Sequence, residues 1–209
     1  MKVLMLEGNE GVCAVHASGA LRRGEIILYP TDTLYGLGAD AFSDSAVDSI
    51  FEIKDRDPQK PIHCVCADLA MAEEYAEVND AAKKLAEKFL PGALTLILKK
   101  RQGIETGIGR GMNTIGIRIP DNSFCIEVAR SLAKPYTATS ANLAGLETGL
   151  SISEVLTQLG SKAEKITLAI DAGTLPLRLP STVVNVVSGN PVILREGAIS
   201  KEDIEAVFR

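Results

Sequence analysis

Short apolar runs alternate with amphipathic segments along the chain, and this alternation constrains the fold more than any other feature. Gly, Pro, Asn and Asp separate the runs, which is typical of strands joined to helices. The expected strands lie at 25–30, 62–66, 93–98, 114–119, 136–139 and 166–171. The expected helices begin near Ser43, Asp68, Asp80, Ser123, Ser151 and Ser200. Strands that are separated by helices pair in parallel, so the pattern predicts an α/β sheet.

The last two expected strands, 182–187 and 191–194, break this pattern because only Ser188-Gly189-Asn190 separates them. Such spacing predicts an antiparallel hairpin. The predicted fold class is therefore α/β (α+β), with a single mixed parallel and antiparallel sheet and flanking helices in one domain, 1–209. Ligands of such sheets bind beyond strand ends. The loops expected there are 31–38, 103–112 and 140–149.

The composition narrows the class of protein. The 209 residues include 46% hydrophobic and 23% charged side chains, as in ordinary globular proteins. No apolar run approaches the roughly 20 residues that cross a bilayer, and Glu7 makes the N-terminal stretch a poor signal peptide. We therefore expect a cytoplasmic protein with its four cysteines buried and reduced. The net charge of −5 argues against general affinity for nucleic acid.

Two short segments offer polar groups next to expected secondary structure. Segment 29–38 ends a strand with hydroxyls, a carboxylate and two glycines, which suit either a small polar ligand or a turn capped by Thr31 and Asp32. Ser140 and Asn142 follow another strand, where they form either an Asx turn or a pair of hydrogen-bonding groups for a nucleotide. The residues alone leave both choices open.

Cations occur at three places where they need an explanation. Lys54 and Arg56 end an expected helix, where they can meet the helix dipole. A compact ammonium beside a forked guanidinium also suits a triphosphate. Arg118 lies inside an apolar strand and Arg195 ends another, and each needs an anion because an unpaired buried charge is costly. That anion is either a protein carboxylate or a ligand; Glu196 is too close to Arg195 along a strand to be its obvious partner.

Several common site types are missing from the sequence. There is no Gly-x-x-x-x-Gly-Lys-[Ser/Thr] P-loop, and the glycines of 107–111 do not follow a strand as a dinucleotide fingerprint requires. Ser140 lacks the frame of a serine nucleophile. His16 and His63 are far apart, and Cys64 with Cys66 supplies too few ligands. We therefore expect no protein-bound metal site.

Eight segments, in their order and spacing from about Gly24 onward, resemble the YrdC/TsaC family of threonylcarbamoyl-AMP synthases. The segments are 29–38, 54–56, 60–61, 90–92 with Thr95, 118–120, 140–142, 181–184 and 194–198. The resemblance implies a single twisted YrdC-like sheet with a concave, positively lined ligand cleft. It also implies a nucleotidyltransferase that converts L-threonine, bicarbonate and ATP, with Mg²⁺, to threonylcarbamoyl-AMP and pyrophosphate for the t6A modification of tRNA position 37. The implied partners are tRNA or the machinery that transfers the product, with no membrane.

The same resemblance implies roles for individual residues. Those implied to bind ATP are Lys54, Arg56, Lys60, Thr114, Ser140, Asn142, Thr148 and Arg195, with Lys54 and Arg56 catalytic. Those implied to bind threonine are Thr33, Arg118 and Ser181. The chain departs from the family in three places: Asp57 stands where a proline often follows the Lys-x-Arg pair, residues 148–150 replace Ser-Pro-Thr, and the family's histidine falls on Val65. His63 therefore receives no role from the resemblance.

Two other functions fit parts of the sequence. An RNA-binding module with a cationic concave surface is favoured by Lys99-Lys100-Arg101 and Arg110, but an acidic balance and 4% aromatic residues offer few stacking platforms. A carbamoyl-transfer domain, of the kind found within larger hydrogenase-maturation proteins, is disfavoured by the short chain.

Overall fold

Eleven strands form one mixed sheet in the computed structural model, which describes residues 1–209. Their order is β1-β9-β2-β3-β8-β4-β7-β6-β10-β11, and β5 pairs with the end of β6. The strands are β1 (Lys2–Met5), β2 (Ile26–Pro30), β3 (Tyr35–Gly38), β4 (His63–Val65), β5 (Ala76–Glu77), β6 (Leu94–Lys100), β7 (Thr114–Arg118), β8 (Tyr136–Ser140), β9 (Ile166–Asp171), β10 (Thr182–Asn185) and β11 (Val192–Arg195). The predicted mixed sheet is confirmed, as is the antiparallel hairpin of β10 and β11.

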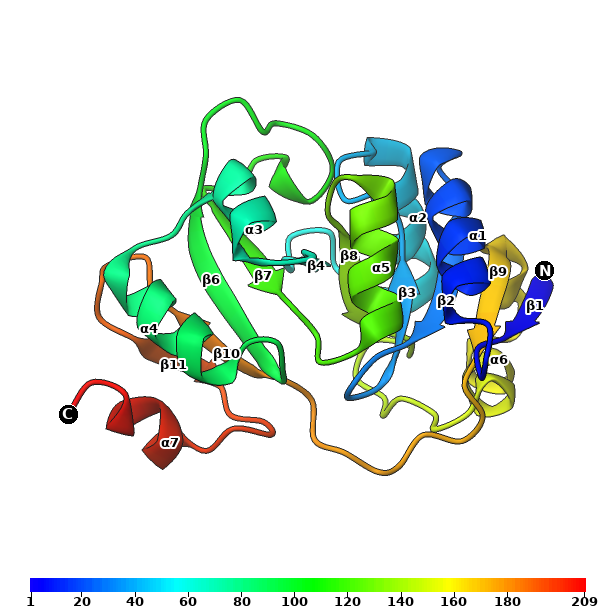
Figure 1. The fold of residues 1–209 in the computed structure, drawn as a ribbon. Helices are drawn as coiled ribbons and strands as arrows, with labels where there is room; N and C mark the ends of the chain where they lie inside the picture. The colour runs from blue at the N-terminus through cyan, green and yellow to red at the C-terminus, as the bar shows by residue number, and fades with distance from the viewer.

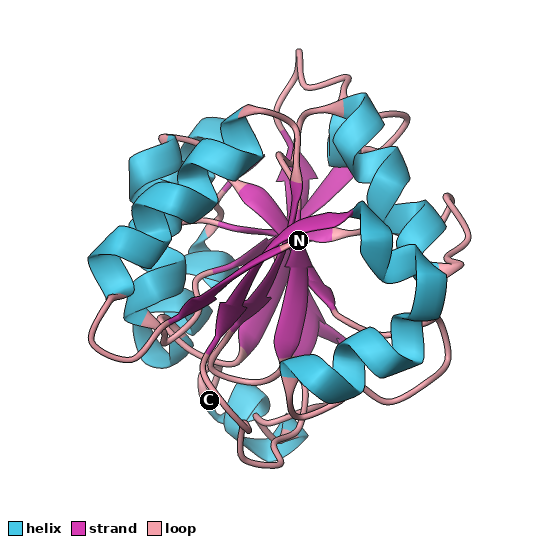
Figure 2. Ribbon diagram, turned by 90° about the vertical axis from the view of Figure 1, so that its right-hand side faces the viewer, coloured by secondary structure: helices cyan, strands magenta, loops and turns pink.

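Helices flank the sheet, which twists so strongly that its strands fan out when seen end-on (Figures 1 and 2). The α-helices are α1 (Glu10–Arg22), α2 (Asp44–Lys54), α3 (Leu69–Tyr75), α4 (Asp80–Phe89), α5 (Ser123–Leu132), α6 (Ile152–Leu159) and α7 (Lys201–Ala206). Two 3₁₀ segments, η1 (Gly107–Gly109) and η2 (Gly160–Lys165), complete the structure. None of these helices is long and apolar enough to cross a membrane.

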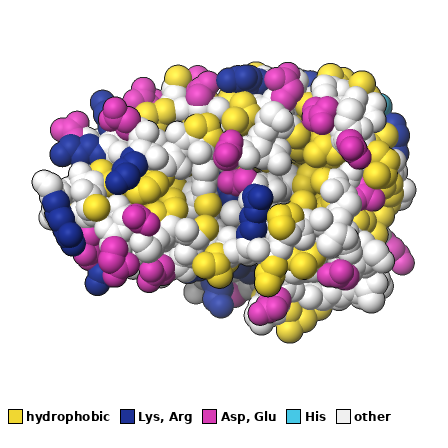
Figure 3. Space-filling model, turned by 60° about the horizontal axis from the view of Figure 1, so that its bottom comes forward, with side chains coloured by type: hydrophobic (Ala, Val, Ile, Leu, Met, Phe, Trp, Pro, Cys, Tyr) yellow, Lys and Arg dark blue, Asp and Glu magenta, His cyan; other side chains and the backbone are white.

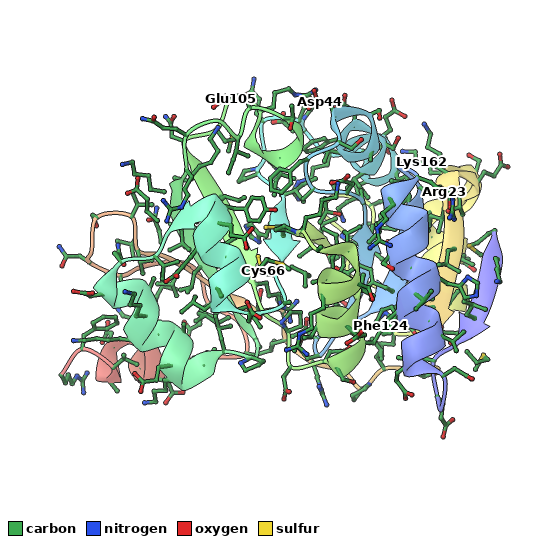
Figure 4. The ribbon with its side chains drawn as sticks, turned by 45° about the horizontal axis from the view of Figure 1, so that its top comes forward. Arg23, Asp44, Cys66, Glu105, Phe124 and Lys162 are labelled. Atoms are coloured by element: carbon green, nitrogen blue, oxygen red, sulfur yellow. The ribbon has the colours of Figure 1, made fainter.

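The alternation of side chains along each strand divides the interior into two cores. Leu94, Leu96 and Leu98 of β6 join the larger core, which α2, α4 and α6 share. The smaller core lies on the other face, where α1 and α5 pack together and Phe124 of α5 is buried (Figure 4). Thr95 lies between Leu94 and Leu96 and therefore faces away from the larger core. This second face carries the polar residues described below.

Two strands differ from the sequence-based expectation. β1 was expected only to be a poor signal peptide, yet it pairs in parallel with β9 at the sheet edge. Segment 31–38 was expected to be a loop, but its second half is β3, antiparallel to β2. Gly38 faces Ile27, and a Cβ on Gly38 would lie 2.7 Å from the Ile27 Cγ1 atom. The glycine there permits a close approach within a strand and does not mark a turn.

Helix starts follow the predicted capping residues with one exception. The Ser43, Asp68, Ser151 and Ser200 side chains each accept a hydrogen bond from a backbone amide three residues later. Asp80 was expected to cap α4, but the neighbouring Asn79 does so by accepting from the Ala82 amide at 3.0 Å. Asp80 instead lies in the first turn, where its charge stabilises the helix dipole. The four cysteines are buried and unpaired, as predicted.

The segment 172–181 connects β9 to β10, which lie in opposite halves of the sheet, and passes below it (Figure 1). Tyr35 donates its hydroxyl to the Gly173 carbonyl at 2.8 Å, and Arg178 donates to the Asp32 carbonyl at 2.6 Å. These bonds attach the segment to the loop between β2 and β3. The segment then reaches Ser181, directly before β10.

Candidate active site

A cleft of about 720 Å³ opens where several strands end on the second face of the sheet. Strands β2, β7, β8 and β11 supply residues at their carboxyl ends, and β4, β6 and β10 supply residues at or near their amino ends. The predicted site residues that line the cleft are Thr33, Arg56, Arg118, Ser140, Ser181 and Arg195.

Three guanidinium groups converge in this cleft. Burial lowers the pKa of Arg56 and of Arg195, and the charges of Arg118 and Arg56 lower that of Arg195 further. The Nε atoms of Arg56 and Arg118 are buried and have no hydrogen-bond partner in the protein. Buried polar groups without partners are rare and costly. The cleft is therefore built to receive anionic groups.

Arg118, which is 8% exposed, forms an ion pair with a protein carboxylate. It donates to the Asp32 carboxylate at 2.5 Å and to the Thr33 hydroxyl at 2.8 Å. The other carboxylate oxygen of Asp32 accepts the Asp121 amide at 3.2 Å. The sequence left open whether a protein or a ligand anion serves Arg118. The structure supplies Asp32 and still leaves the Arg118 Nε atom free for a ligand.

Arg56 and Arg195 have only neutral oxygen partners. Arg56 donates to the Pro61 carbonyl at 3.0 Å, and Arg195 donates to the Ser181 carbonyl at 2.8 Å and to the Ser181 hydroxyl at 3.3 Å. The Ser181 hydroxyl also shares a hydrogen bond of 2.9 Å with Thr95. These contacts orient both guanidiniums without neutralising them.

Lys54 lies beneath the cleft and is only 1% exposed. Its ammonium donates to the Ser140 carbonyl, to the Asn142 carbonyl at 2.8 Å and to the Asn142 Oδ1 atom at 3.3 Å. Burial, followed by the charge of Arg56, lowers the pKa of Lys54 to about 7. An ammonium has three N–H donors, so this arrangement leaves none for a phosphate. Lys54 instead fixes the turn after β8.

The turn after β8 has the internal bonds of an Asx-type structure. Asn142 donates to the Leu143 carbonyl at 2.8 Å and to the Leu146 carbonyl at 2.7 Å. Its Oδ1 atom accepts from Ser140 and, at 3.2 Å, from Thr148. Asn142 is 8% exposed and lies below the cleft surface, whereas Ser140 lines the cleft. The turn thus presents a hydroxyl and holds it with Asn142.

His63 begins β4 and lines the cleft, although the sequence assigned it no role. Burial, together with the charges of Arg195, Arg56 and Arg118, lowers its pKa to about 4. The ring lies against Gly116 of β7, where a Cβ would come within 2.3 Å of the His63 Cδ2 atom. This contact with another strand helps to place the ring, and the local sequence around His63 does not indicate it.

Other predicted positions lie outside the cleft lining. Lys60 is exposed in the loop after α2, and Thr114 is at the opposite end of β7 from Arg118. The expected placement of segment 103–112 at the cleft is wrong. Its Gly107 amide donates to Asp44 at 2.6 Å, at the start of α2, where Glu105 and Asp44 lie near each other at the top of Figure 4. The cleft is at the far end of this 11-residue helix, about 15 Å away.

The charge distribution at the surface bears on the RNA-binding alternative. Of the cations that favoured it, Lys99 pairs with Glu77, Lys100 with Glu105, and Arg110 with Asp48. On the lower face of the molecule, basic side chains are scattered and form no continuous patch (Figure 3). Neighbouring carboxylates therefore neutralise most of the cations that favoured the RNA-binding alternative.

An open mixed sheet that gathers three guanidiniums at its strand ends defines an α/β protein whose cleft is built for small anionic molecules. The chain belongs to the Sua5/YciO/YrdC family, whose model, described as "Telomere recombination", matches residues 19–197. The family resemblance and the YrdC-like fold expected from the sequence are therefore confirmed.

Relatives of this chain carry more specific names. It is 39% identical over 176 residues to a putative threonylcarbamoyl-AMP synthase of Methanocaldococcus jannaschii, covering 84% of this chain and 81% of that protein. It is 35% identical over 193 residues to the threonylcarbamoyl-AMP synthase of Pyrococcus abyssi, covering 92% of this chain and 56% of that protein. The crystal structure of P. abyssi Sua5 complexed with L-threonine matches with a TM-score of 0.89 and 33% identity, covering 99% of this chain and 60% of that one. The chain thus spans little more than half the length of the P. abyssi protein.

Proposed function

We propose that this chain is a nucleotidyltransferase that forms L-threonylcarbamoyl-AMP and pyrophosphate from L-threonine, bicarbonate and ATP. One observation carries the proposal: three guanidiniums converge in a small cleft, and two of them keep a buried Nε atom without a partner. Every proposed substrate contributes an anion to such a site. The names of the relatives, one of them seen with L-threonine, support the same choice of substrates.

The cleft offers two groups of residues to two proposed substrates. Thr33, Arg118 and Ser181 present two hydroxyls and a guanidinium, which suit the carboxylate and hydroxyl of threonine. Arg56, Arg195 and Ser140 line the same cleft, with Arg195 bonded to Ser181, and suit the phosphates and the nucleotide. Of the remaining residues proposed for ATP, Lys54 and Asn142 lie below the cleft and Thr148 bonds to Asn142, whereas Lys60 and Thr114 lie outside the cleft lining. Of these, Lys54 would act through the turn that it holds.

The proposed chemistry suits cations without a protein nucleophile. Transfer of the carbamate onto the α-phosphate releases pyrophosphate and moves negative charge onto phosphoryl oxygens. Preorganised donors aimed at that charge supply most of the catalysis in such reactions. No three His, Cys, Asp or Glu side chains are grouped to hold a metal ion. The proposed Mg²⁺ therefore enters as the magnesium complex of ATP, bound by the phosphates.

The proposed product would serve the t6A modification of tRNA, and the proposed partners are tRNA or the proteins that transfer the threonylcarbamoyl group. The cytoplasm is the proposed place of action, because tRNA modification occurs there. We also propose that residues 1–209 act as a single YrdC-like domain, since the strands that line the cleft belong to one sheet.

Pyrophosphate release tests the proposed activity. The purified protein is incubated with ATP, Mg²⁺ and bicarbonate, and each of the 20 amino acids is added in turn. We expect release only when threonine and bicarbonate are both present, with serine disfavoured by about 1–3 kcal/mol, the worth of a methyl niche. Release that is independent of either substrate would refute the proposal. Retardation of tRNA in a gel without any turnover would favour an RNA-binding module instead.

A further inference from the structure

His63 is an imidazole that faces the cleft without a partner. It occupies the floor because Gly116, on the neighbouring strand, leaves room for the ring, and Ala138 stands opposite it on β8. No hydrogen bond from the protein affects the pKa of its side chain. The side chain is only partly buried and lines the cleft, so a ligand can reach it. Here the ring nitrogens are left for something that enters the cleft.

The charged groups around His63 come from three elements. Arg195 of β11 has the largest effect, followed by Arg56 after α2 and Arg118 of β7. Two carboxylates lie close to these cations: Asp32, which is already paired with Arg118, and Asp57, whose charge acts on Arg56. Together with burial, the three cations keep the imidazole neutral in the empty cleft. A neutral imidazole has a free lone pair and can accept a proton.

The proposed reaction requires such an acceptor. At neutral pH the α-amino group of an amino acid is largely protonated, and an ammonium cannot attack bicarbonate. The guanidiniums of the cleft cannot accept a proton, because their pKa lies far above neutrality. The ammonium of Lys54 is occupied by carbonyl oxygens, and Asp32 is held by Arg118 and the Asp121 amide. Tyr29 and Tyr35 donate their hydroxyls to carbonyl oxygens, so His63 alone remains available among the titratable groups of the cleft.

We propose, on the basis of the proposed function, that His63 is the general base that accepts a proton from the substrate ammonium during carboxylation. The lone pair of the imidazole takes one proton, and the resulting amine attacks the carbon of bicarbonate. The C–N bond forms while the C–OH bond breaks, and the hydroxide leaves as water with a second proton from nitrogen. The products are the carbamate, water and the imidazolium of His63, so atoms and charge balance.

The position of His63 fits this role. It lines the same cleft as Arg118, which is proposed for threonine, and Arg56 and Arg195, which are proposed for ATP, and the charges of all three act on it. Carboxylate, bicarbonate and phosphates that bind these cations cancel the charges that disfavour the imidazolium. Binding of the substrates therefore raises the proton affinity of His63 at the moment when the base is needed.

Chemical rescue tests the proposal. His63→Ala removes the ring and leaves room for free imidazole. We expect turnover to fall about a hundredfold or more, the usual contribution of a general base, and added imidazole to restore it. Substituted imidazoles are expected to restore turnover in the order of their basicity. His16→Ala, at the other histidine of the chain and exposed on α1, is the matched control and is expected to keep wild-type turnover.

A second variant and a spectroscopic measurement keep the proposal testable if His63→Ala changes the folding of the protein. His63→Asn keeps a polar side chain but cannot act as a base, so it is expected to lose turnover while its KM for ATP changes little. In the wild-type protein, NMR titration of His63 is expected to give a higher pKa with threonine and a non-hydrolysable ATP analogue bound than without them. Both measurements use the full chain.

The outcomes separate this proposal from the proposed function. Wild-type protein that shows no threonine-dependent pyrophosphate release overturns both. Active wild-type protein with an equally active His63→Asn variant overturns the base alone. A rise in the KM for threonine with no rescue by imidazole and an unchanged pH profile also overturns it, because His63 would then only position the substrate.

Discussion

The two ends of α2 carry charged side chains that the molecule treats in opposite ways. At the amino end, Asp44 accepts the Gly107 amide and Asp48 pairs with Arg110, so segment 103–112 satisfies these charges. At the carboxyl end, Arg56 meets only a carbonyl oxygen and keeps a buried Nε atom without a partner. A charge that the protein pairs with itself supports the structure, whereas a cation left unpaired in a cleft is available to a ligand.

The largest effect is expected at the unpaired end. Arg56→Met should lower kcat/KM by a factor of about 10² to 10³, the range measured when one preorganised donor to a transition state is removed. Its free energy of unfolding should stay equal or rise, because burial of an unpaired cation is costly. Pyrophosphate kinetics and urea unfolding check the two values. A stability loss that matches the activity loss would break the comparison, since Arg56 would then be structural.

The pH dependence of stability measures how burial and the arginines of the cleft affect the pKa of His63. The pKa of His63 is lowered to about 4 in the folded protein, against about 6.5 when unfolded. Between these values the unfolded chain binds more protons, so stability is complete above pH 6.5 and is lost as the pH falls towards 4. The loss from His63 should reach up to about 3 kcal/mol.

Urea unfolding between pH 4 and 7 measures this loss. The control is His63→Asn, which does not titrate and should give a flatter profile over the same range. Parallel profiles for the two proteins would show that neither burial nor the arginines lower the pKa of His63.

Lys54 is expected to contribute to stability although it lies close to Arg56, because its N–H groups are bonded to oxygens of the protein. Lys54→Met leaves three oxygens of the β8 turn without their donor. We expect a loss of about 2 kcal/mol in the free energy of unfolding, together with reduced turnover because Ser140 loses its support. Lys54→Arg should not restore either property, since the larger guanidinium does not fit the same three acceptors. Lost turnover at unchanged stability would instead place the ammonium on the substrate.

The smallest effect is expected at the paired, exposed end of α2. Arg110→Ala removes an ion pair between side chains that are nearly half exposed, and such pairs contribute little. Turnover and the midpoint of urea unfolding should both stay at the wild-type values. A clear loss of turnover would show that segment 103–112 takes part in the reaction, and the contrast between the two ends would disappear.

The fold could be predicted from the sequence to the extent that periodicity reports it. Six strands and the final hairpin were placed because their apolar runs are bounded by turn residues. β1 and β3 were missed because β1 is mostly exposed and two of the four residues in β3 are glycines. Their pairing is decided by neighbouring strands, which a local pattern does not contain.

The candidate site could be predicted only as a set of residues. The order of the motifs selected Arg56, Arg118 and Arg195, and the structure brings all three into one cleft. The order of the motifs did not indicate that the N–H groups of Lys54 are all hydrogen-bonded beneath the turn, or that Asp32 pairs with Arg118. These contacts join residues that lie 86 to 88 positions apart. Tertiary packing determines side-chain partners at such separations, and the spacing of motifs along the sequence does not reveal them.

The crossing of segment 172–181 from one half of the sheet to the other affects how the protein is made. Synthesis from the amino end produces Thr33 and Asp32 early, whereas Ser181 and Arg195 emerge about 150 residues later and can reach their places only after this crossing. Contacts between such distant parts of a chain form slowly. A growing polypeptide that has not yet released β10 and β11 therefore lacks one wall of the cleft. Capacity to hold nucleotide should appear abruptly and late during translation.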